Sequence, residues 1–364
     1  MKKTSLRKIL SLALACLFLA ASLCSCTNKL GEPLMTLEDS YISTNMYRLW
    51  LSRVKGAYSG NNNAVWDTVD EDGRTYNEIF TGFVKQNAMK YLSAMHEFDE
   101  LGLKLPEDEI KEIDTAMADM LAERADGDKD ALNAILSQFG VNYDILREIY
   151  VIEAKLSYLE EHLYGENGTE SVTDEMRESF YTGNYSRIKQ IFFYTANKPV
   201  LDDEGKYTYD EKGNIKTRDY TEAEIAEQKK KASNVMTALT AGQDFDLIMA
   251  SQNEDTAAAS YPNGYYLTLS SQYMPEVIGA AFELGENEFK MVESEYGIHI
   301  VLRLPLDEKG YASEKNADFF SDFEDALRAD LFTKRLAAHE DKIKIDEDLL
   351  AKYDIKNAVA NTVY

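Results

Sequence analysis

The spacing of apolar residues changes along the chain and divides it into parts. In residues 84–98 and again in residues 143–163 apolar residues recur every three or four positions, which predicts amphipathic helices. The clearest predicted helix covers residues 143–163. At Ser186 the period changes, and residues 187–194 alternate in the manner of a strand. A helical part is therefore expected to give way to a mixed part near Gly183.

Glycine, proline and acidic residues predict where the first helices begin and end. Gly102 follows the periodic run of residues 84–98, as a glycine does after a helix. Pro106 precedes three acidic residues, a combination that favours a helix start. Residues 126–130 (Asp-Gly-Asp-Lys-Asp) lack the ligand spacing of an EF-hand, so they predict a turn and a helix cap rather than a calcium site.

The mixed part predicts the order strand, helix, helix, strand, helix, strand, strand. After the strand at 187–194, residues 201–220 contain two turn signals and predict a surface hairpin, or alternatively a disordered loop. The expected helices cover residues 222–241, 245–251 and 275–282. A strand or turn is expected at 265–269, and strands are expected around 291–292 and at 298–304. Residues beyond 307 return to a helical pattern.

The pattern as a whole predicts an α+β protein with a helical N- and C-terminal module and an inserted domain of mixed sheet and helices. The 364 residues are enough for two or three domains, each with its own core. We expect a helical domain at 26–182, a mixed domain at 183–306 with the insertion at 201–220, and a C-terminal helical segment at 307–364.

The first 25 residues have the pattern of a signal peptide. Four basic residues precede an apolar run, residues 9–23, that is short for a membrane span. The run ends in Leu23-Cys24-Ser25-Cys26, which resembles a bacterial lipobox and marks Cys26 as the lipidated residue. An ordinary secretory signal and an uncleaved anchor are the alternatives. All three cysteines lie in this region, so the exported body would contain no disulfide.

The net charge of the chain limits the classes of partner that it is expected to bind. Removing residues 1–25 removes four basic and no acidic residues, which takes the net charge from −25 to −29. Such acidity argues against nucleic acid as a partner and against charge-driven adhesion to anionic lipid. Membrane attachment would come from the lipid on Cys26, which supplies two acyl chains.

Four blocks of sequence, in a fixed order, carry a resemblance to a known family. They are Ala-Gly-Gln-Asp-Phe at 241–245, Gln-Tyr-Met-Pro-Glu-Val at 272–277, Ala-Ala-Phe-Glu-Leu-Gly-Glu at 280–286 and Tyr-Gly-Ile-His-Ile at 296–300. Together they resemble a parvulin-type (PpiC) peptidyl-prolyl isomerase domain over residues 187–304. The flanking helices, including residues 139–146 and 180–181, resemble those of the PrsA-like and SurA-like exported foldases.

The resemblance implies a location and a class of partner. PrsA-like proteins are lipoproteins on the outer face of the bacterial cytoplasmic membrane, and their N- and C-terminal helices pack together as a chaperone module. The implied partners are unfolded or partly folded exported proteins with X-Pro bonds. No cofactor and no metal are implied, and the sequence does not define the oligomeric state.

The resemblance also implies a set of site residues. The parvulin site contains two facing histidines, of which the second is His299, a hydroxyl residue at Ser294, and a cysteine or aspartate at Asp255. Phe282 occupies a supporting wall position. On an alternating strand, however, a lone histidine is more often structural, and an aspartate in Asn-Glu-Asp-Thr (253–256) often caps a turn.

Three positions depart from the family pattern. Gln190 stands in place of the first histidine, Tyr273 in place of the methionine that seats the proline ring (with Met274 next to it), and Val277 in place of the seat phenylalanine. The other three histidines lie outside the domain. A glutamine can hold His299 in one tautomer, but a weakened isomerase is expected.

Isomerisation of an X-Pro bond meets a barrier of about 18–20 kcal/mol and breaks no bond, so it requires neither a nucleophile nor a metal. The sequence therefore predicts a membrane-anchored foldase with isomerase activity. A non-catalytic chaperone or scaffold that only binds client segments is the alternative that Gln190 and Val277 favour. A solute-binding lipoprotein would require two large α/β lobes. Aromatic residues near Tyr47 and Trp50, if exposed, would line a client-binding cleft.

Overall fold

The computed structural model describes residues 31–70, 72–255, 258 and 260–362. The chain divides into two units, one formed by residues up to Ser171 and from Arg328 onward, the other by Val172–Leu327. Helices and strands occur in both, so the α+β class predicted from the sequence is confirmed. The signal peptide at 1–25 and the lipidation residue Cys26 lie outside the described residues.

The first unit consists mainly of helices. Asn142 caps the long α6 helix and the pair Thr75 and Glu78 forms a reciprocal capping box at α3, because each satisfies an amide at the helix start. Its elements are β1 (Pro33–Leu37), β2 (Ser40–Ser43), α2 (Thr44–Tyr58), η1 (Asn63–Asp67), α3 (Tyr76–Glu100), α4 (Glu107–Ala125), α5 (Lys129–Leu136), η2 (Ser137–Phe139), α6 (Tyr143–Tyr164), η6 (Glu340–Lys342), β9 (Lys344–Ile345), α12 (Glu347–Leu350) and the larger part of α11 (Phe323–Ala337).

The helix boundaries predicted from turn residues are confirmed. Helix α3 ends just before Gly102, which has a left-handed φ of +65°, and α4 begins directly after Pro106. The 126–130 segment forms a turn in which Asp128 caps α5 by accepting from two backbone amides. Of the apolar residues of α6, Ile145, Ile149 and Ile152 belong to the core of this unit. Leu159 and Leu163 are buried as well.

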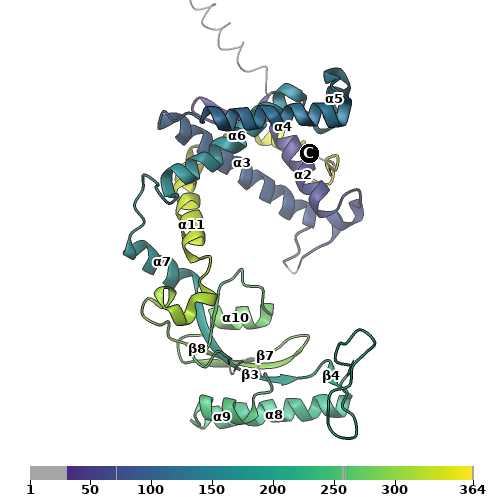
Figure 1. Ribbon diagram of the computed structural model, residues 1–364, viewed down its shortest axis with the longest axis vertical. Coiled ribbons are helices and arrows are strands. Elements are labelled where there is room, and N and C mark those ends of the chain that lie inside the picture. Colours follow the sequence, from purple (N-terminus) through teal and green to yellow (C-terminus); the bar gives the residue numbers. More distant parts are fainter. Residues whose placement is uncertain (1–30, 71, 256–257, 259, 363–364) are drawn as a thin grey trace, which may run out of the picture. The chain divides into compact units, whose positions relative to one another are not determined.

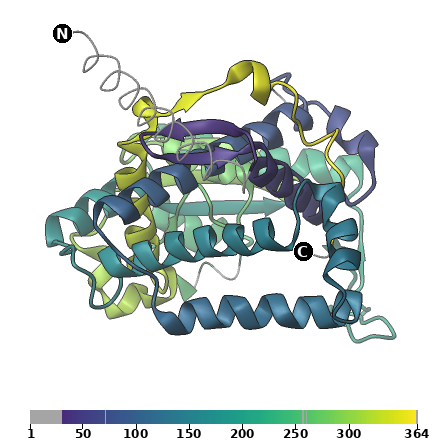
Figure 2. The same ribbon diagram turned by 90° about the horizontal axis from the view of Figure 1, so that it is seen from above.

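The first unit contains a three-stranded sheet that was not predicted, since helical segments were expected at 26–182 and 307–364. Its order is β2-β1-β9, and Met35 of β1 pairs with Ile345 of β9. Figure 2 shows the purple β1–β2 hairpin near the yellow C-terminal segment. Strands of two to five residues are too short to display a period, and this explains why they were overlooked.

The second unit is built around a four-stranded antiparallel sheet of order β6-β3-β8-β7. The long central strands pair from Arg187 with Leu304 to Tyr194 with Gly297. The elements of this unit are α7 (Asp174–Asn184), β3 (Ser186–Tyr194), β4 (Lys198–Pro199), β5 (Thr217–Arg218), α8 (Glu222–Thr240), α9 (Phe245–Gln252), β6 (Tyr265–Leu267), α10 (Pro275–Glu283), β7 (Phe289–Glu293), β8 (Gly297–Leu304), η4 (Gly310–Ala312), η5 (Glu314–Phe319) and the first turn of α11.

Helices cover both faces of this sheet (Figure 1). Ile191, Phe193 and Ile300 point toward α8 and α9, where they form one apolar cluster. Ile188 and Val301 belong to a second cluster with α10. Because successive side chains of a strand point to opposite faces, β3 and β8 each contribute to both clusters.

The unit boundaries differ from those expected at 182/183 and 306/307. They lie at 171/172 and 327/328, so α7 and the segment after β8 belong to the sheet-containing unit. The physical reason is an aromatic cluster in which the ring of Tyr181 contacts Tyr266, Tyr311 and Phe320 at centroid distances of 5.3–6.4 Å. These contacts join residues that lie far apart in the sequence, so the local pattern of apolar residues does not predict them.

Among the described residues no helix is both long enough and apolar enough to cross a membrane.

Candidate functional site

His299 lies at the centre of a buried polar group in the sheet of the second unit. Only 1% of its surface is exposed. Phe192, its partner in register on β3, stacks on the imidazole with 4.5 Å between ring centroids. Gln190 comes two residues earlier on β3, so it points to the same face of the sheet. A polar pair buried this deeply is stable only if its hydrogen bonds are made.

Gln190 makes those bonds through both ends of its amide. Its nitrogen donates to Oδ2 of Asp255 at 3.2 Å and to the Tyr273 hydroxyl at 2.6 Å. Its oxygen lies 3.0 Å from Nδ1 of His299. Since a carboxylate only accepts, the amide nitrogen must face Asp255, and the amide oxygen then requires a proton on Nδ1.

Ser294 completes the arrangement on the other side of the ring. Its hydroxyl lies 2.8 Å from Nε2 of His299. With Nδ1 protonated, Nε2 is the acceptor and Ser294 the donor. Burial lowers the pKa of His299 from 6.5 to about 4, while the charges of Glu276 and Asp255 raise it by less. The ring is therefore neutral at pH 7, which agrees with the single tautomer.

Asp255 is positioned by a short segment that follows the edge of β3. The Asn253 side chain accepts from the backbone N–H of Phe192 at 2.7 Å, and the backbone N–H of Glu254 donates to the Phe192 carbonyl at 3.0 Å. The Tyr265 hydroxyl donates to Asp255 Oδ2 at 3.3 Å. Burial raises the pKa of both Tyr265 and Tyr273, so both hydroxyls keep their protons.

Asp255 joins this network to a cavity. A cavity of about 500 Å³ is lined by Asp255, Asn253, Pro262 and the ion pair of Lys189 with Asp246. His299 itself is enclosed. A ligand in this cavity would contact the Asp255 carboxylate, which Gln190 links to His299.

The residues expected to seat a proline ring are placed differently. Val277 is fully buried in the cluster under α10, and Met274 and Phe282 are half-buried against the same cluster. Val277 thus offers no surface to a ligand. It is a core residue of helix α10. Of the expected seat residues, Tyr273 is the one whose side chain is hydrogen-bonded into the group around His299.

Two residues of the site were missed from the sequence, Phe192 and Tyr265. Phe192 was detectable, because it lies two positions after Gln190 on an alternating strand and must share its face. Tyr265 had no comparable signal, since its contact with Asp255 depends on how β6 and the 253–255 segment come together.

Comparison with known proteins shows which domain family this region resembles. Residues 209–303 match the family model of the PPIC-type PPIASE domain. The second unit thus contains a PPIC-type domain. The parvulin resemblance read from the four sequence blocks is confirmed. The matched residues include Asp255, Tyr273, Ser294 and His299, whereas β3 with Gln190 precedes them.

The PPIC-type domain is accompanied by a wider similarity. The chain is 25% identical over 255 residues to the foldase protein PrsA of Halalkalibacterium halodurans, an alignment that covers 70% of this chain. The chain spans 63% of the length of that curated relative.

Solved structures of similar proteins include two PrsA proteins. The crystal structure of PrsA from Bacillus subtilis is 17% identical and covers 82% of this chain and 95% of its own, with a TM-score of 0.24. PrsA from Bacillus cereus is also 17% identical and covers 83% and 98%, with a TM-score of 0.30.

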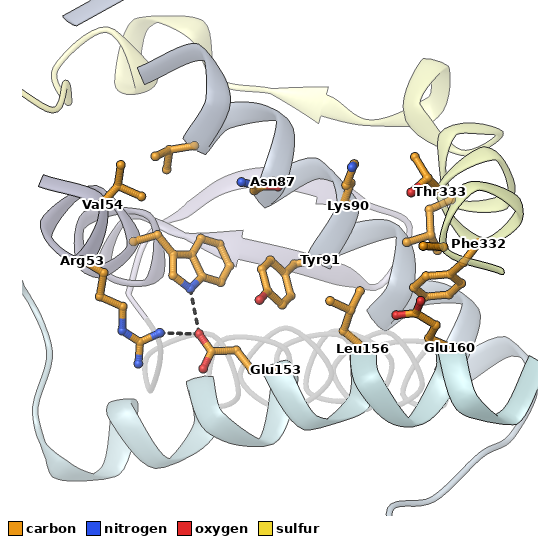
Figure 3. A pocket seen from close by; sticks show the side chains of 14 residues that line it. Arg53, Val54, Asn87, Lys90, Tyr91, Glu153, Leu156, Glu160, Phe332 and Thr333 are labelled. Atoms are coloured by element: carbon orange, nitrogen blue, oxygen red, sulfur yellow. Dashed lines mark hydrogen bonds and ion pairs between the residues drawn. The ribbon is translucent and has the colours of Figure 1, made fainter. Parts of the chain in front are cut away.

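The first unit contains a separate cavity of about 460 Å³ (Figure 3). Trp50 and Tyr91 stack in its wall with 4.8 Å between ring centroids, and Leu156 and Phe332 add apolar surface. The indole N–H of Trp50 donates to Glu153 at 3.1 Å, which fixes the ring.

The interpretation of exposed aromatic residues near Tyr47 and Trp50 needs correction. Tyr47 is fully buried and only 7% of Trp50 is exposed. Trp50 nevertheless lines the cavity, whereas Tyr47 belongs to the core.

On the wall formed by α6, burial and the nearby Glu161 raise the pKa of the Glu160 carboxyl. The cavity combines apolar side chains with six polar ones, a mixture that ligand sites commonly contain; the polar ones are Arg53, Asn87, Lys90, Glu153, Glu160 and Thr333.

Proposed function

We propose that this chain is a foldase of exported proteins, anchored by a lipid on Cys26 at the outer face of the bacterial cytoplasmic membrane, and that its PPIC-type domain isomerises X-Pro bonds. The observation that carries the proposal is the hydrogen-bonded group Gln190–His299–Ser294–Asp255 inside a domain of this family. The similarity to a foldase protein PrsA supports the wider role.

The proposed chemistry uses position and polarity rather than covalent steps. Rotation about the X-Pro bond removes amide resonance, so the transition state has a more localised carbonyl and a pyramidal nitrogen. Gln190, which is hydrogen-bonded to His299, holds the Tyr273 hydroxyl and the Asp255 carboxylate, and Asp255 lines the cavity. Groups fixed in this way need no reorganisation when the carbonyl twists, which is the usual source of electrostatic stabilisation in a protein site.

The helical unit would contribute a second activity, the binding of unfolded segments. The cavity walled by Trp50, Tyr91, Leu156 and Phe332 offers apolar surface to a client side chain. A chain held there is kept from aggregating while its prolines isomerise elsewhere. The strongly acidic surface expected of the mature protein would keep such complexes soluble.

The test is a proline-limited refolding reaction with the chain lacking the predicted signal peptide. Wild type should accelerate it, and His299→Ala should lower kcat/KM by about tenfold or more, the scale of one lost hydrogen-bonding group in a site. His162→Ala, a histidine of the other unit, is the matched control and should leave the rate unchanged. Equal acceleration by wild type and His299→Ala would remove His299 from the mechanism.

A second candidate function is a chaperone whose PPIC-type domain binds proline segments without isomerising them. The full burial of Val277 and the amide at Gln190 favour it. Gln190→His distinguishes the two. A gain of isomerase activity would indicate a site that has lost catalysis, whereas reduced activity would indicate that the glutamine is the working residue.

A further inference from the structure

The insertion at 201–220, with the strands beside it, builds a cavity of its own at the end of β3. The cavity has a volume of about 600 Å³ and lies against the first half of α8. Its apolar lining comes from Tyr194, Pro199, Tyr207, Ile215 and Tyr220. The sequence suggested a hairpin or a disordered loop here and assigned it no role.

The insertion forms one side of this cavity and has a regular hydrogen-bonded structure. Two tight turns shape it, and in each an aspartate side chain, Asp202 or Asp210, accepts from two backbone amides. Gly205 and Gly213 supply the left-handed conformations that these turns require. Strands β4 and β5 pair at its base.

Ion pairs connect the base of the insertion to helix α8. Arg218 and Lys198, one from each strand at the base, both bind the Glu224 carboxylate at 2.5–2.8 Å. These bonds hold the pKa of Glu224 well below its usual range. On the other side, Glu254 accepts from Gln228 and lies 3.5 Å from Lys231. Lys198 and Lys231 thus pair with Glu224 and Glu254, while Glu227 is an exposed carboxylate of the lining. The aromatic side chains remain as surface for a ligand.

That aromatic surface is accessible. Tyr194 is 39% exposed, Tyr207 54% and Ile215 44%. Large apolar side chains this exposed around one hollow are typical of a binding surface.

Contacts between side chains connect the wall of this cavity to the group around His299. Tyr194 packs on Phe192 with 4.6 Å between ring centroids, and Phe192 stacks on His299 at 4.5 Å. Glu254, in the wall of the cavity, is the neighbour of Asp255 on the segment that follows β3. Glu254 thus lines this cavity and the next residue, Asp255, lines the cavity beside the His299 group. Since an extended chain advances about 3.3 Å per residue, a bound peptide would need only a few residues to reach from one cavity to the other.

We propose that this cavity is a subsite for an aromatic side chain of the client, two or three residues away from the proline in the adjoining site. This inference rests on the proposed function, since it assumes that the adjoining site receives proline. Aromatic rings that meet edge to face or offset gain attraction beyond the area they bury, so a ring fits this wall better than an aliphatic or charged side chain.

The experiment uses alanine-based peptides with one central proline and a single phenylalanine placed at each position up to three residues on either side. Dissociation constants and isomerisation rates are measured with wild type, Tyr207→Ala and Tyr209→Ala. Tyr209 is the matched control, because it lies in the same hairpin and is 57% exposed but does not line the cavity. Both changes are at exposed positions, and circular dichroism would check that the fold is retained.

We expect one phenylalanine position to bind wild type more tightly than the all-alanine peptide, by about twofold to tenfold, the range of one aromatic contact. Tyr207→Ala should lose this preference and Tyr209→Ala should keep it. Wild type with no preference at any position, or an equal preference in wild type and Tyr207→Ala, would overturn the inference. If the aromatic preference holds but no peptide is isomerised, the subsite stands and the proposed isomerase function fails.

Discussion

Gln190 joins His299 to Asp255, with its amide oxygen 3.0 Å from Nδ1 of the histidine and its amide nitrogen donating to the carboxylate at 3.2 Å. The family pattern places a histidine at this position. A glutamine can bridge the two groups because its amide carries both a donor and an acceptor in fixed relation. The geometry therefore gives the departure from the pattern a specific structural role.

The first prediction concerns stability. Gln190→Leu should lower the free energy of unfolding by about 1–3 kcal/mol, because it leaves Nδ1 of His299 without its buried partner. Urea denaturation would measure the loss. Gln252→Leu, at an exposed position of α9, serves as the control. An equal effect of both changes would show that the buried bonds contribute nothing specific.

The second prediction concerns pH. The folded state lowers the pKa of His299 from 6.5 to about 4, so folding favours the neutral ring. The stabilisation is complete above pH 6.5 and is lost as the pH falls toward 4, by at most about 3 kcal/mol. The free energy of unfolding of wild type should therefore fall more steeply than that of His299→Gln between pH 6.5 and 4. Parallel curves would contradict the assignment.

The third prediction concerns the carboxylate at the open cavity. Asp255→Ala should reduce isomerase activity by about tenfold or more, since it removes the carboxylate that joins the cavity to the His299 group. Asp246→Ala is the matched control, because Asp246 lines the same cavity but pairs with Lys189 outside the His299 group. The rates would be measured on one X-Pro peptide. Similar losses in both variants would point to cavity charge rather than to Asp255.

The fourth prediction concerns the helical unit. Leu156→Gln should weaken the suppression of client aggregation and leave the isomerisation of short peptides unchanged, because Leu156 lines the cavity beside Trp50 and Tyr91. Light scattering of an aggregating client measures the first activity. Leu101→Gln, in the same unit and 45% exposed outside this cavity, should behave as wild type. Unchanged suppression by Leu156→Gln would remove the cavity from client binding.

The fifth prediction concerns the membrane anchor. In a bacterial host fed labelled palmitate, the wild-type chain should incorporate the label and remain with the membrane fraction. Cys26→Ser should lose both properties, because the lipid provides the attachment. Cys24→Ser should retain them. Labelling lost in Cys24→Ser and kept in Cys26→Ser would place the lipid on the other cysteine.

The sequence by itself determined the local structure of this protein. The alternation of residues 187–194 predicted β3, the apolar stripe predicted α6, and Gly102 marked the end of α3. A helix or strand that packs on one side places its apolar residues on that side. Its apolar residues therefore recur in the sequence with the period of the helix or of the strand. The motif around His299 was recognisable for the same reason, because its blocks are local.

Only the tertiary structure decided which distant residues meet. The partners of Gln190 lie 65, 83 and 109 positions away, and Tyr265 joins them through Asp255. The burial of Val277, the pairing of β1 with β9 and the assignment of α7 to the sheet-containing unit depend in the same way on packing between segments. Local periodicity fixes which side of an element is apolar, but it does not specify which other element covers that side.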